Sequence, residues 1–480
     1  MAYVKGENRQ QINMFPEIID DYVGEDNPVR VIEAFVISLN MSEIGFERAK
    51  EPILGRPAYD PRDLLKLYLY GYLNRIRSSR KLESEASRNL EVIWLLSGLK
   101  PDFKTIADFR KDNKEAVKKV FKQFSLLCKE WGLYGQTLVA VDGSKFRASN
   151  SKKKNFNEKK LNRHLKYIDT KIEQYLNELE EGDQSEANTH KPSAAEIKQH
   201  IQELKERKKK YEEMLETIKE NEVSEISLTD PDARQMSTNN NGIDICYNVQ
   251  TVVDEKHSMI VDYDVINNAA DLGQLNQMAK RAQNVFDTEE INVLADKGYY
   301  SGKDIKECEN SKLKTYVAKP KNANATGNEE FYINKFKYDA ENDYYTCPAG
   351  HILPFACYRK NKGEIIGRDY HNYKACKTCK LRDHCTKAKR GRSIYRSIHQ
   401  DLLDEVDKRT RENKELYTKR QMIVEHPFGT IKRSWGYNYF LTRGLNSVNA
   451  ESGLAFLAYN ITRAINILGV KEMVSRLQAI

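Results

Sequence analysis

The spacing of hydrophobic and polar positions changes along the chain, and these changes predict several kinds of structure. From Asp60 to Arg110 hydrophobic residues recur at helical spacing. Asp60, Pro61 and Asp63 resemble an N-cap, an N1 proline and a capping-box acid at the start of this run. A second start signal, residues 105–108, repeats this capping logic. The pattern predicts short, capped helices.

Strand patterns dominate the next part of the chain. Residues 136–146 are rich in β-branched and apolar side chains and predict a buried strand that ends near Asp142. Residues 244–254 and 258–265, separated by a short polar turn, predict a β-hairpin. Between the first strand and this hairpin, residues 151–223 are dense in Lys and Glu, with hydrophobic positions at helical spacing in two runs. This segment is predicted to be an inserted, charged helical hairpin.

Helices and strands then alternate, which decides the fold class. Because two antiparallel strands precede the alternation, the order differs from a simple βαβ repeat and predicts a mixed α/β sheet with parallel crossovers. Residues 322–396 are rich in Tyr, Lys and Cys and show little periodicity, and helical spacing returns from Glu405. The alternating elements are a helix at 271–286, a strand at 291–296, a helix at 301–310 and a strand at 313–318.

Length and composition narrow the class of protein. At about 150 residues per domain, 480 residues predict about three domains. No stretch approaches the ~20 apolar residues of a membrane span, so no membrane partner is expected. The first residues lack the apolar core of a signal peptide, so we expect a cytoplasmic protein whose 8 cysteines are thiols or metal ligands. The net charge of +8 permits a polyanionic partner.

Basic residues concentrate on the predicted N-terminal helices, which is typical of a DNA-docking helical domain. A solvated face on an ordinary helical bundle is the alternative explanation. The basic positions are Arg75, Arg77, Arg80, Lys81, Arg88 and Arg110.

Three acids are candidate catalytic residues. Asp142 and Asp296 end two short apolar strands, and Glu425 follows the apolar residues 422–424 in a late helix. If they meet, their mutual repulsion requires cations. Two divalent ions about 3.5 to 4 Å apart would also align the attacking and leaving oxygens on one phosphorus atom. Carboxylate oxygens favour Mg²⁺ or Mn²⁺.

Each of these acids also has a local structural explanation. Asp142 with Gly143, and Asp296 with the residues up to Gly298, could form tight turns at strand ends. Glu425, two residues before Pro427, could be a first-turn glutamate favoured by the helix dipole.

Several segments together resemble bacterial insertion-sequence transposases with a ribonuclease-H-like, or DDE, catalytic core, in their cysteine-containing branch. They include VAVDGSKFRA around Asp142, TDPDARQM followed by YNVQTVVD, ADKGYYS around Asp296 and VEHPFGTIKRSWG around Glu425. The segments GRPAYDPRDLLKLYLYGYL and PDFKTIADFR are similar to that family's N-terminal helical domain. The resemblance covers almost the whole chain apart from the charged hairpin and the ends.

The resemblance implies roles for individual residues. Asp142, Asp296 and Glu425 would be the metal-binding catalytic triad. The family's Tyr-Arg-Glu-Lys signature maps to Tyr417, Arg420, Glu425 and Lys432.

The match departs from the family pattern at one point in this signature. Four residues separate Arg420 from Glu425, where the commonest pattern has three, which puts the role of Arg420 in question. Glu425 and Lys432 lie seven residues apart, two helical turns, which predicts that both share one helix face. Lys432 would then contact a DNA phosphate, with a surface lysine as the alternative.

The cysteines form a further candidate site. Cys347, Cys376, Cys379 and Cys385 include a Cys-x-x-Cys pair and could form a four-sulfur structural Zn²⁺ site. Reduced, buried cysteines are the alternative. Lysines, arginines and tyrosines flank the cluster, and this basic segment, which includes Lys389 and Arg390, is a candidate reader of the phosphate backbone.

Pattern and resemblance together predict the domain organisation. Residues 1–134 would form an N-terminal helical DNA-binding domain. Residues 135–321 and 397–480 would form the ribonuclease-H-like core, with a mixed five-stranded sheet and the hairpin insertion at 151–225. Residues 322–396 would form a Cys-rich, basic insertion that binds zinc.

The implied function is a transposase that cleaves and joins DNA strands at the ends of its own insertion sequence, using two Mg²⁺ or Mn²⁺ ions. Its partners would be terminal inverted repeats and target DNA, with a homodimer in the DNA complex, in the bacterial cytoplasm at the nucleoid. One alternative is a catalytically inactive, sequence-specific DNA-binding protein, either a domesticated transposase or a repressor. Another is a nuclease of the same core that acts on RNA or branched DNA.

Overall fold

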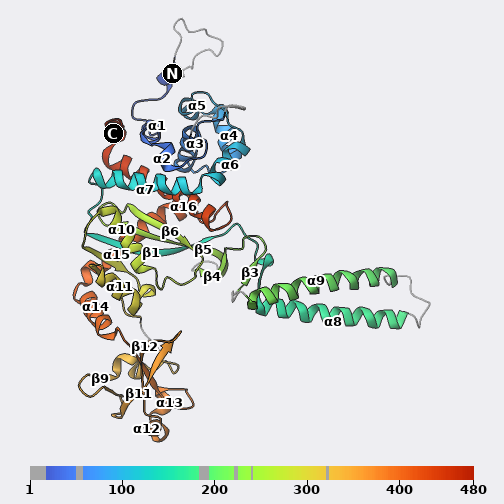
Figure 1. Ribbon diagram of the computed structural model, residues 1–480, viewed down its shortest axis with the longest axis vertical. Helices are drawn as coiled ribbons and strands as arrows, with labels where there is room; N and C mark the ends of the chain where they lie inside the picture. Colours follow the sequence, from blue (N-terminus) through green and yellow to red (C-terminus); the bar gives the residue numbers. More distant parts are fainter. Residues whose placement is uncertain (1–17, 50–57, 183–193, 221–224, 239–241, 321–323) are drawn as a thin grey trace, which may run out of the picture.

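The N-terminal part of the chain is entirely helical in the computed structural model, which describes residues 18–49, 58–182, 194–220, 225–238, 242–320 and 324–480 (Figure 1). The predicted start at Asp60 is confirmed, because the Asp60 side chain accepts the backbone N–H of Arg62. The cap predicted at Thr105 is wrong by three residues, since Asp102 is the N-cap and accepts the N–H groups of Lys104 and Thr105. The helices are η1 (Ile19–Tyr22), α1 (Val29–Ser38), α2 (Met41–Ile44), α3 (Pro61–Leu73), α4 (Ser79–Arg88), α5 (Leu90–Leu95), α6 (Phe103–Asp112) and α7 (Lys114–Glu130).

A mixed sheet forms the centre of the molecule, which confirms the predicted mixed α/β class. Strand β5 pairs antiparallel with β1 and β6, whereas β7 pairs parallel with β1 and β8. The sheet has 6 strands rather than the predicted five, because β4 and β6 pair with successive parts of the long β5. Its strands are β1 (Leu138–Arg147), β4 (Arg234–Thr238), β5 (Gly242–Asp254), β6 (Ile260–Ile266), β7 (Ile291–Ala295) and β8 (Leu313–Val317).

Helices from the second half of the chain join this sheet to the N-terminal helices in one hydrophobic core. Helix α16 contacts α3, α7 and β6. Asn460, a polar residue in its apolar run, binds both the N–H and the C=O of Ile260. Among the described helices, no single one is long and apolar enough to cross a membrane. These helices are α10 (Leu275–Phe286), α11 (Gly302–Asn310), α14 (Gln400–Glu412), α15 (Lys414–Phe428), α16 (Leu445–Leu468) and α17 (Val470–Gln478).

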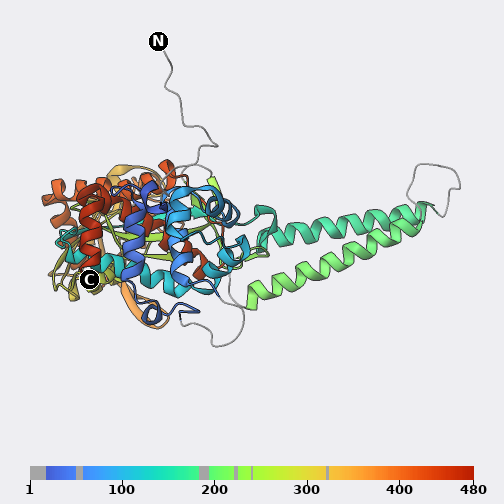
Figure 2. The same ribbon diagram turned by 90° about the horizontal axis from the view of Figure 1, so that it is seen from above.

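Two long helices, α8 (Glu158–Gly182) and α9 (Ala194–Glu220), run side by side and project from the body of the molecule (Figures 1 and 2). A short ladder of β2 (Asn155–Asn157) and β3 (Glu225–Ser227) closes their base. A small apolar cluster that includes Phe156 and Met214 packs there. The charged segment between the strands is therefore an extended arm.

A second, antiparallel sheet occupies residues 337–397, where the sequence shows little periodicity. The physical reason is exposure: of the ten residues of β11, only Leu353 is buried, so the strand has no continuous hydrophobic face. Tyr345, Tyr370 and Ile394 add to a small separate core. The elements are β9 (Lys337–Asp339), β10 (Tyr344–Thr346), β11 (Ile352–Asn361), β12 (Glu364–His371), α12 (Tyr373–Thr378), α13 (Arg382–Cys385) and β13 (Ser393–Ser397).

Candidate catalytic site and cysteine pocket

Asp142 lies within β1 rather than at its end. The strand continues to Arg147, and Gly143 pairs with Gln250 of β5, so both the predicted strand end and the tight-turn alternative are wrong. The pKa of the Asp142 carboxyl is raised to about 7, chiefly by burial; the charge of Arg420 opposes this rise, and the charges of Asp296 and Asp271 contribute to it. Asp142 is therefore an acid crowded by other acids.

Asp296 directly follows β7, which runs parallel to β1. Val141 and Ala295 are paired across these strands, so Asp142 and Asp296 follow neighbouring positions at the same edge. Asp296 Oδ1 accepts the backbone N–H of Gly298 at 2.6 Å and caps a short 3₁₀ turn. The turn interpretation of Asp296 is thus correct locally, and the same residue also lies beside Asp142.

A third acid at this edge, Asp271, is not among the residues selected from the sequence. The predicted helix at 271–286 begins only at Leu275, and Asp271 lies in the loop before it. Its Oδ1 accepts hydrogen bonds from Asn248 Nδ2 at 2.7 Å, Gln250 Nε2 at 2.8 Å and Lys145 Nζ at 3.2 Å. The signal in the sequence is the pair of amides at alternate positions of the largely buried β5, because buried amides require polar partners.

Helix α15 packs against β1, β5 and β7 beside these acids. The Tyr417 hydroxyl donates to the carbonyl of Ala295 at 3.2 Å and fastens the helix to the end of β7. Arg420 lies close enough to Asp142 for its charge to lower the pKa of that carboxyl. The departure in spacing after Arg420 therefore leaves its guanidinium beside the acids.

Glu425 is placed differently from the two aspartates. It lies in the last turn of α15, so the first-turn alternative is wrong. Its exposed carboxylate accepts a hydrogen bond from Gln421 Nε2 at 2.8 Å. Within the described ranges, no three His, Cys, Asp or Glu side chains are arranged to hold a metal ion.

Lys432 turns back to the strand that carries Asp142. Its Nζ donates to Ser144 Oγ at 2.9 Å and to the carbonyl of Lys145 at 2.8 Å. Burial lowers the pKa of its ammonium group. The alternative of a surface lysine is therefore wrong.

Three further basic residues selected from the sequence, Arg110, Lys389 and Arg390, divide into two groups. Arg110 packs over the ring of Tyr68 at 5.5 Å, inside the helical part of the molecule, where the charge of Glu451 faces it. This placement gives Arg110 a structural role rather than the predicted exposure to DNA. Lys389 and Arg390 are exposed in the segment between α13 and β13.

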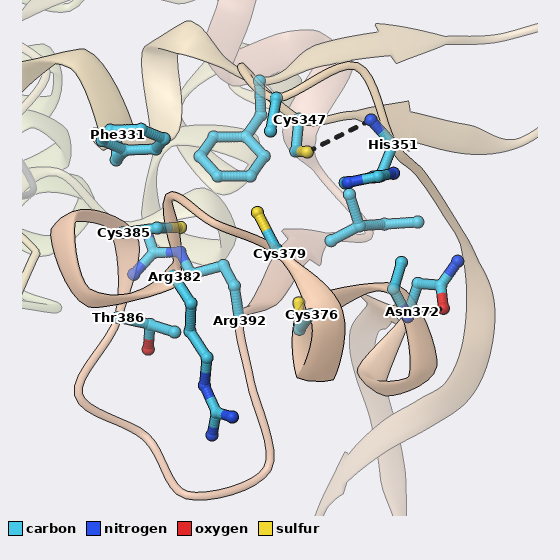
Figure 3. Close-up of a pocket in the computed structure, with 14 residues that line it drawn as sticks. Phe331, Cys347, His351, Asn372, Cys376, Cys379, Arg382, Cys385, Thr386 and Arg392 are labelled. Atoms are coloured by element: carbon cyan, nitrogen blue, oxygen red, sulfur yellow. Dashed lines mark hydrogen bonds between the residues drawn. The ribbon is translucent and has the colours of Figure 1, made fainter.

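The four predicted zinc ligands line one pocket of the second sheet (Figure 3). Burial raises the pKa of the Cys385 thiol, Arg392 opposes this, and the thiols of Cys376, Cys347 and Cys379 raise it further. The backbone N–H of His351 donates to Cys347 Sγ at 3.4 Å. The pocket thus gathers four sulfurs, although in the described part of the chain they do not form a ready metal-binding group.

Two family models match separate parts of the chain. The model described as transposase DDE domain matches residues 346–465, which include the four cysteines of the pocket, Glu425 and Lys432. The model described as transposase domain (DUF772) matches residues 17–112, the N-terminal helices. No curated protein and no solved structure matches. Asp142 and Asp296 lie outside both matched segments, so their assignment depends on the geometry described above.

Proposed function

We propose that the chain is an insertion-sequence DDE transposase, which cleaves and joins DNA strands at the ends of its own element by two-metal-ion phosphoryl transfer; the matches to two transposase family models support this proposal. The observation that carries the proposal is the parallel pairing of Val141 with Ala295, which sets Asp142 and Asp296 side by side. The strand order β6-β5-β1-β7-β8, with β5 antiparallel to its neighbours, supports a ribonuclease-H-like core.

The proposed metal ligands are Asp142, Asp296 and Glu425. The two aspartates fit Mg²⁺ or Mn²⁺, because they offer oxygen donors and because the Asp142 anion is destabilised by burial and by its acidic neighbours. Bound metal would supply the positive charge that offsets this repulsion and polarises the phosphate. Glu425, exposed on α15, would have to turn toward the aspartates to complete the set.

The remaining residues of the site would bind and orient the DNA. Lys432 and Arg420 bring positive charge to Asp142 and suit a phosphate oxygen approaching this strand edge. Tyr417 uses its hydroxyl on Ala295, so its proposed contribution to DNA binding is to position α15. Water and then a freed 3′ hydroxyl would attack phosphorus in line.

We expect two basic regions to bind the DNA backbone outside the site. Arg75, Arg80 and Lys81 are exposed at the end of α3 and the start of α4, and Lys389 and Arg390 are exposed beside the cysteine pocket. Two DNA ends must be processed together, so we also propose a homodimer in the DNA complex, at the bacterial nucleoid. DNA affinity that falls steeply with salt would support phosphate contacts.

We further propose a structural Zn²⁺ in the cysteine pocket. Cys347, Cys376, Cys379 and Cys385 supply four sulfur donors around one space, and a short rearrangement of their side chains would complete a tetrahedral set. The small core of this sheet, with five buried residues among the described ones, supports the need for such a cross-link.

The proposal is tested with the full-length protein and duplex DNA that carries the sequence flanking its coding region. We expect nicking and joining in Mg²⁺ or Mn²⁺ but not in EDTA, and loss of both with Asp142→Asn while DNA binding is retained. Asp287→Asn, the same change at an exposed position after α10, is the matched control. An Asp142→Asn protein that cuts like the wild type would refute the assignment. Binding without cutting in any metal would favour the inactive DNA-binding alternative.

A further inference from the structure

Asp271 occupies space that only a glycine in β1 leaves open. A Cβ atom on Gly143 would lie 2.5 Å from Asp271 Oδ1 and 2.2 Å from Gln250 Nε2. The Asp271 carboxylate therefore packs against bare backbone at the residue that follows Asp142.

The two oxygens of the Asp271 carboxylate have different surroundings. Oδ1 accepts the three hydrogen bonds from Asn248, Gln250 and Lys145. Oδ2 accepts none from the residues that the structure describes, and it lies 3.7 Å from the position of a Cβ on Gly298. Asp296 Oδ1 lies 2.9 Å from the same point. One oxygen is thus anchored, and the other faces the neighbourhood of Asp296.

An unpaired buried oxygen lies beside this carboxylate. Asn248 is fully buried, and its Oδ1 has no hydrogen-bond partner in the described part of the chain. The atom lies 3.0 Å from the position of a Cβ on Gly143. The Nδ2 of the same amide donates to Asp271 Oδ1 and to the carbonyl of Asn268, so the unpaired atom is the oxygen. A buried acceptor without a partner is destabilising, and a cation or its bound water would offset that cost.

A further layer of contacts fixes the residues that hold Asp271. The buried Tyr299 hydroxyl donates to Gln250 Oε1 at 2.5 Å, which turns Gln250 Nε2 toward Asp271. Such supports are typical of metal-binding carboxylates, whose orientation depends on their hydrogen-bonded neighbours. Asp271 is therefore held by more hydrogen bonds than a loop carboxylate that only faces solvent.

We propose that Asp271 is a further cation-binding carboxylate of the catalytic site, acting with Asp142 and Asp296 on the divalent ion, with the oxygen of Asn248 directed at the same region. This inference rests on the proposed function. It assigns Lys145 as a counter-ion that neutralises Asp271 until metal binds.

The test measures binding of Mn²⁺ alone to the full-length protein, without DNA, from the electron paramagnetic resonance signal of free Mn²⁺. We expect Asp271→Asn to weaken Mn²⁺ binding by at least about tenfold, and high Mn²⁺ to restore part of its DNA cleavage. A merely structural defect would not respond to the metal concentration. Asp287→Asn should match the wild type, with thermal unfolding as the check on folding.

Lys145→Met separates the proposal from a simple ion-pair role. If Lys145 competes with metal for Asp271, its removal should leave Mn²⁺ binding unchanged or make it tighter. A Lys145→Met protein with the same loss as Asp271→Asn would overturn the inference, and so would wild-type Mn²⁺ affinity in Asp271→Asn when Asp142→Asn binds weakly. Wild-type Mn²⁺ affinity in Asp142→Asn would instead refute the proposed catalytic metal site itself.

Discussion

Gly143→Ala is the most informative single change, because it adds one methyl group where β1, β5 and Asp271 meet. The new Cβ would lie 2.2 Å from Gln250 Nε2, 2.5 Å from Asp271 Oδ1 and 3.0 Å from Asn248 Oδ1. Carbon and polar atoms rarely approach within 3 Å, so the two side chains or the strand must move by roughly 0.5 to 1 Å.

The displacement should cost activity more than stability. Overpacking of this kind typically destabilises a protein by about 1–3 kcal/mol. A misplacement of about 1 Å at reacting groups can reduce the rate by about a hundredfold. Asp142 precedes the altered residue, so we expect strand cleavage to fall by about that factor while the protein stays folded.

The assay compares cleavage rates of the flanking DNA with urea unfolding of the same preparations. Gly135→Ala is the matched control, because its new Cβ would meet its nearest neighbour, Lys256 Cβ, at an ordinary 3.4 Å. We expect Gly135→Ala to cleave like the wild type. A Gly143→Ala protein that cleaves at the wild-type rate would refute the argument that these contacts position the site.

Three other changes test separate parts of the structure. Lys432→Met removes the ammonium group that contacts Ser144 and Lys145. A charged hydrogen bond contributes about 1.5–3 kcal/mol, so we expect cleavage to be roughly 10- to 100-fold slower. Unchanged cleavage would contradict a role of Lys432 at the site. Arg409→Met breaks the ion pair with Glu309. Burial by itself would raise the pKa of the Glu309 carboxyl, but the contact with Arg409 lowers it. Above the ordinary pKa of 4.5, the variant should be less stable than the wild type by about 1–3 kcal/mol in urea unfolding. This difference should disappear as the pH falls through the lowered pKa of Glu309 in the folded protein. An equal difference in acid would contradict the prediction. Cys379→Ser should remove bound zinc measured by elemental analysis, and an equal zinc content in wild type and variant would exclude the pocket.

The hydrophobic pattern predicted the elements that carry the two aspartates. The apolar runs before Asp142 and Asp296 are typical of buried strands, and they form the adjacent parallel strands β1 and β7, while the hairpin of β5 and β6 lies on the other side of β1. The sequence predicts a strand end at Asp142 because Asp-Gly is also a turn signal. In the structure, Gly143 instead pairs with Gln250 within the sheet, and its lack of a side chain leaves space for Asp271.

Asp271 and the second sheet were less accessible from the sequence. Residues 271–274 share the polar pattern of a helix start, but Gly273 has a φ of 85° and turns the chain before α10 begins. The pairing of Asp271 with Asn248 joins positions 23 residues apart, which no local periodicity records. In the second sheet, exposed strands leave no period to detect.

The departure in spacing between Arg420 and Glu425 has a physical counterpart in the structure. Tyr417, Arg420 and Val424 lie three or four residues apart on α15, and Val424 is buried where the commonest pattern has the acid. Glu425 is thus turned by about 100° from that face. Lys432 still reaches Ser144, although it lies eight residues after Val424.

A π-helical segment, Gly429–Ser434, follows Pro427 and explains how Lys432 returns to the strand. A π turn contains one more residue than an α turn, so it accommodates the extra position between Arg420 and Lys432. The prediction that Glu425 and Lys432 share one face holds only for an uninterrupted α-helix. If the π turn instead lay before Glu425, this acid would rotate onto the helix face that Val424 now occupies. Lys432 would keep its present position. Such a shift would give Glu425 the orientation that its proposed role needs, and metal bound between the carboxylates would favour it.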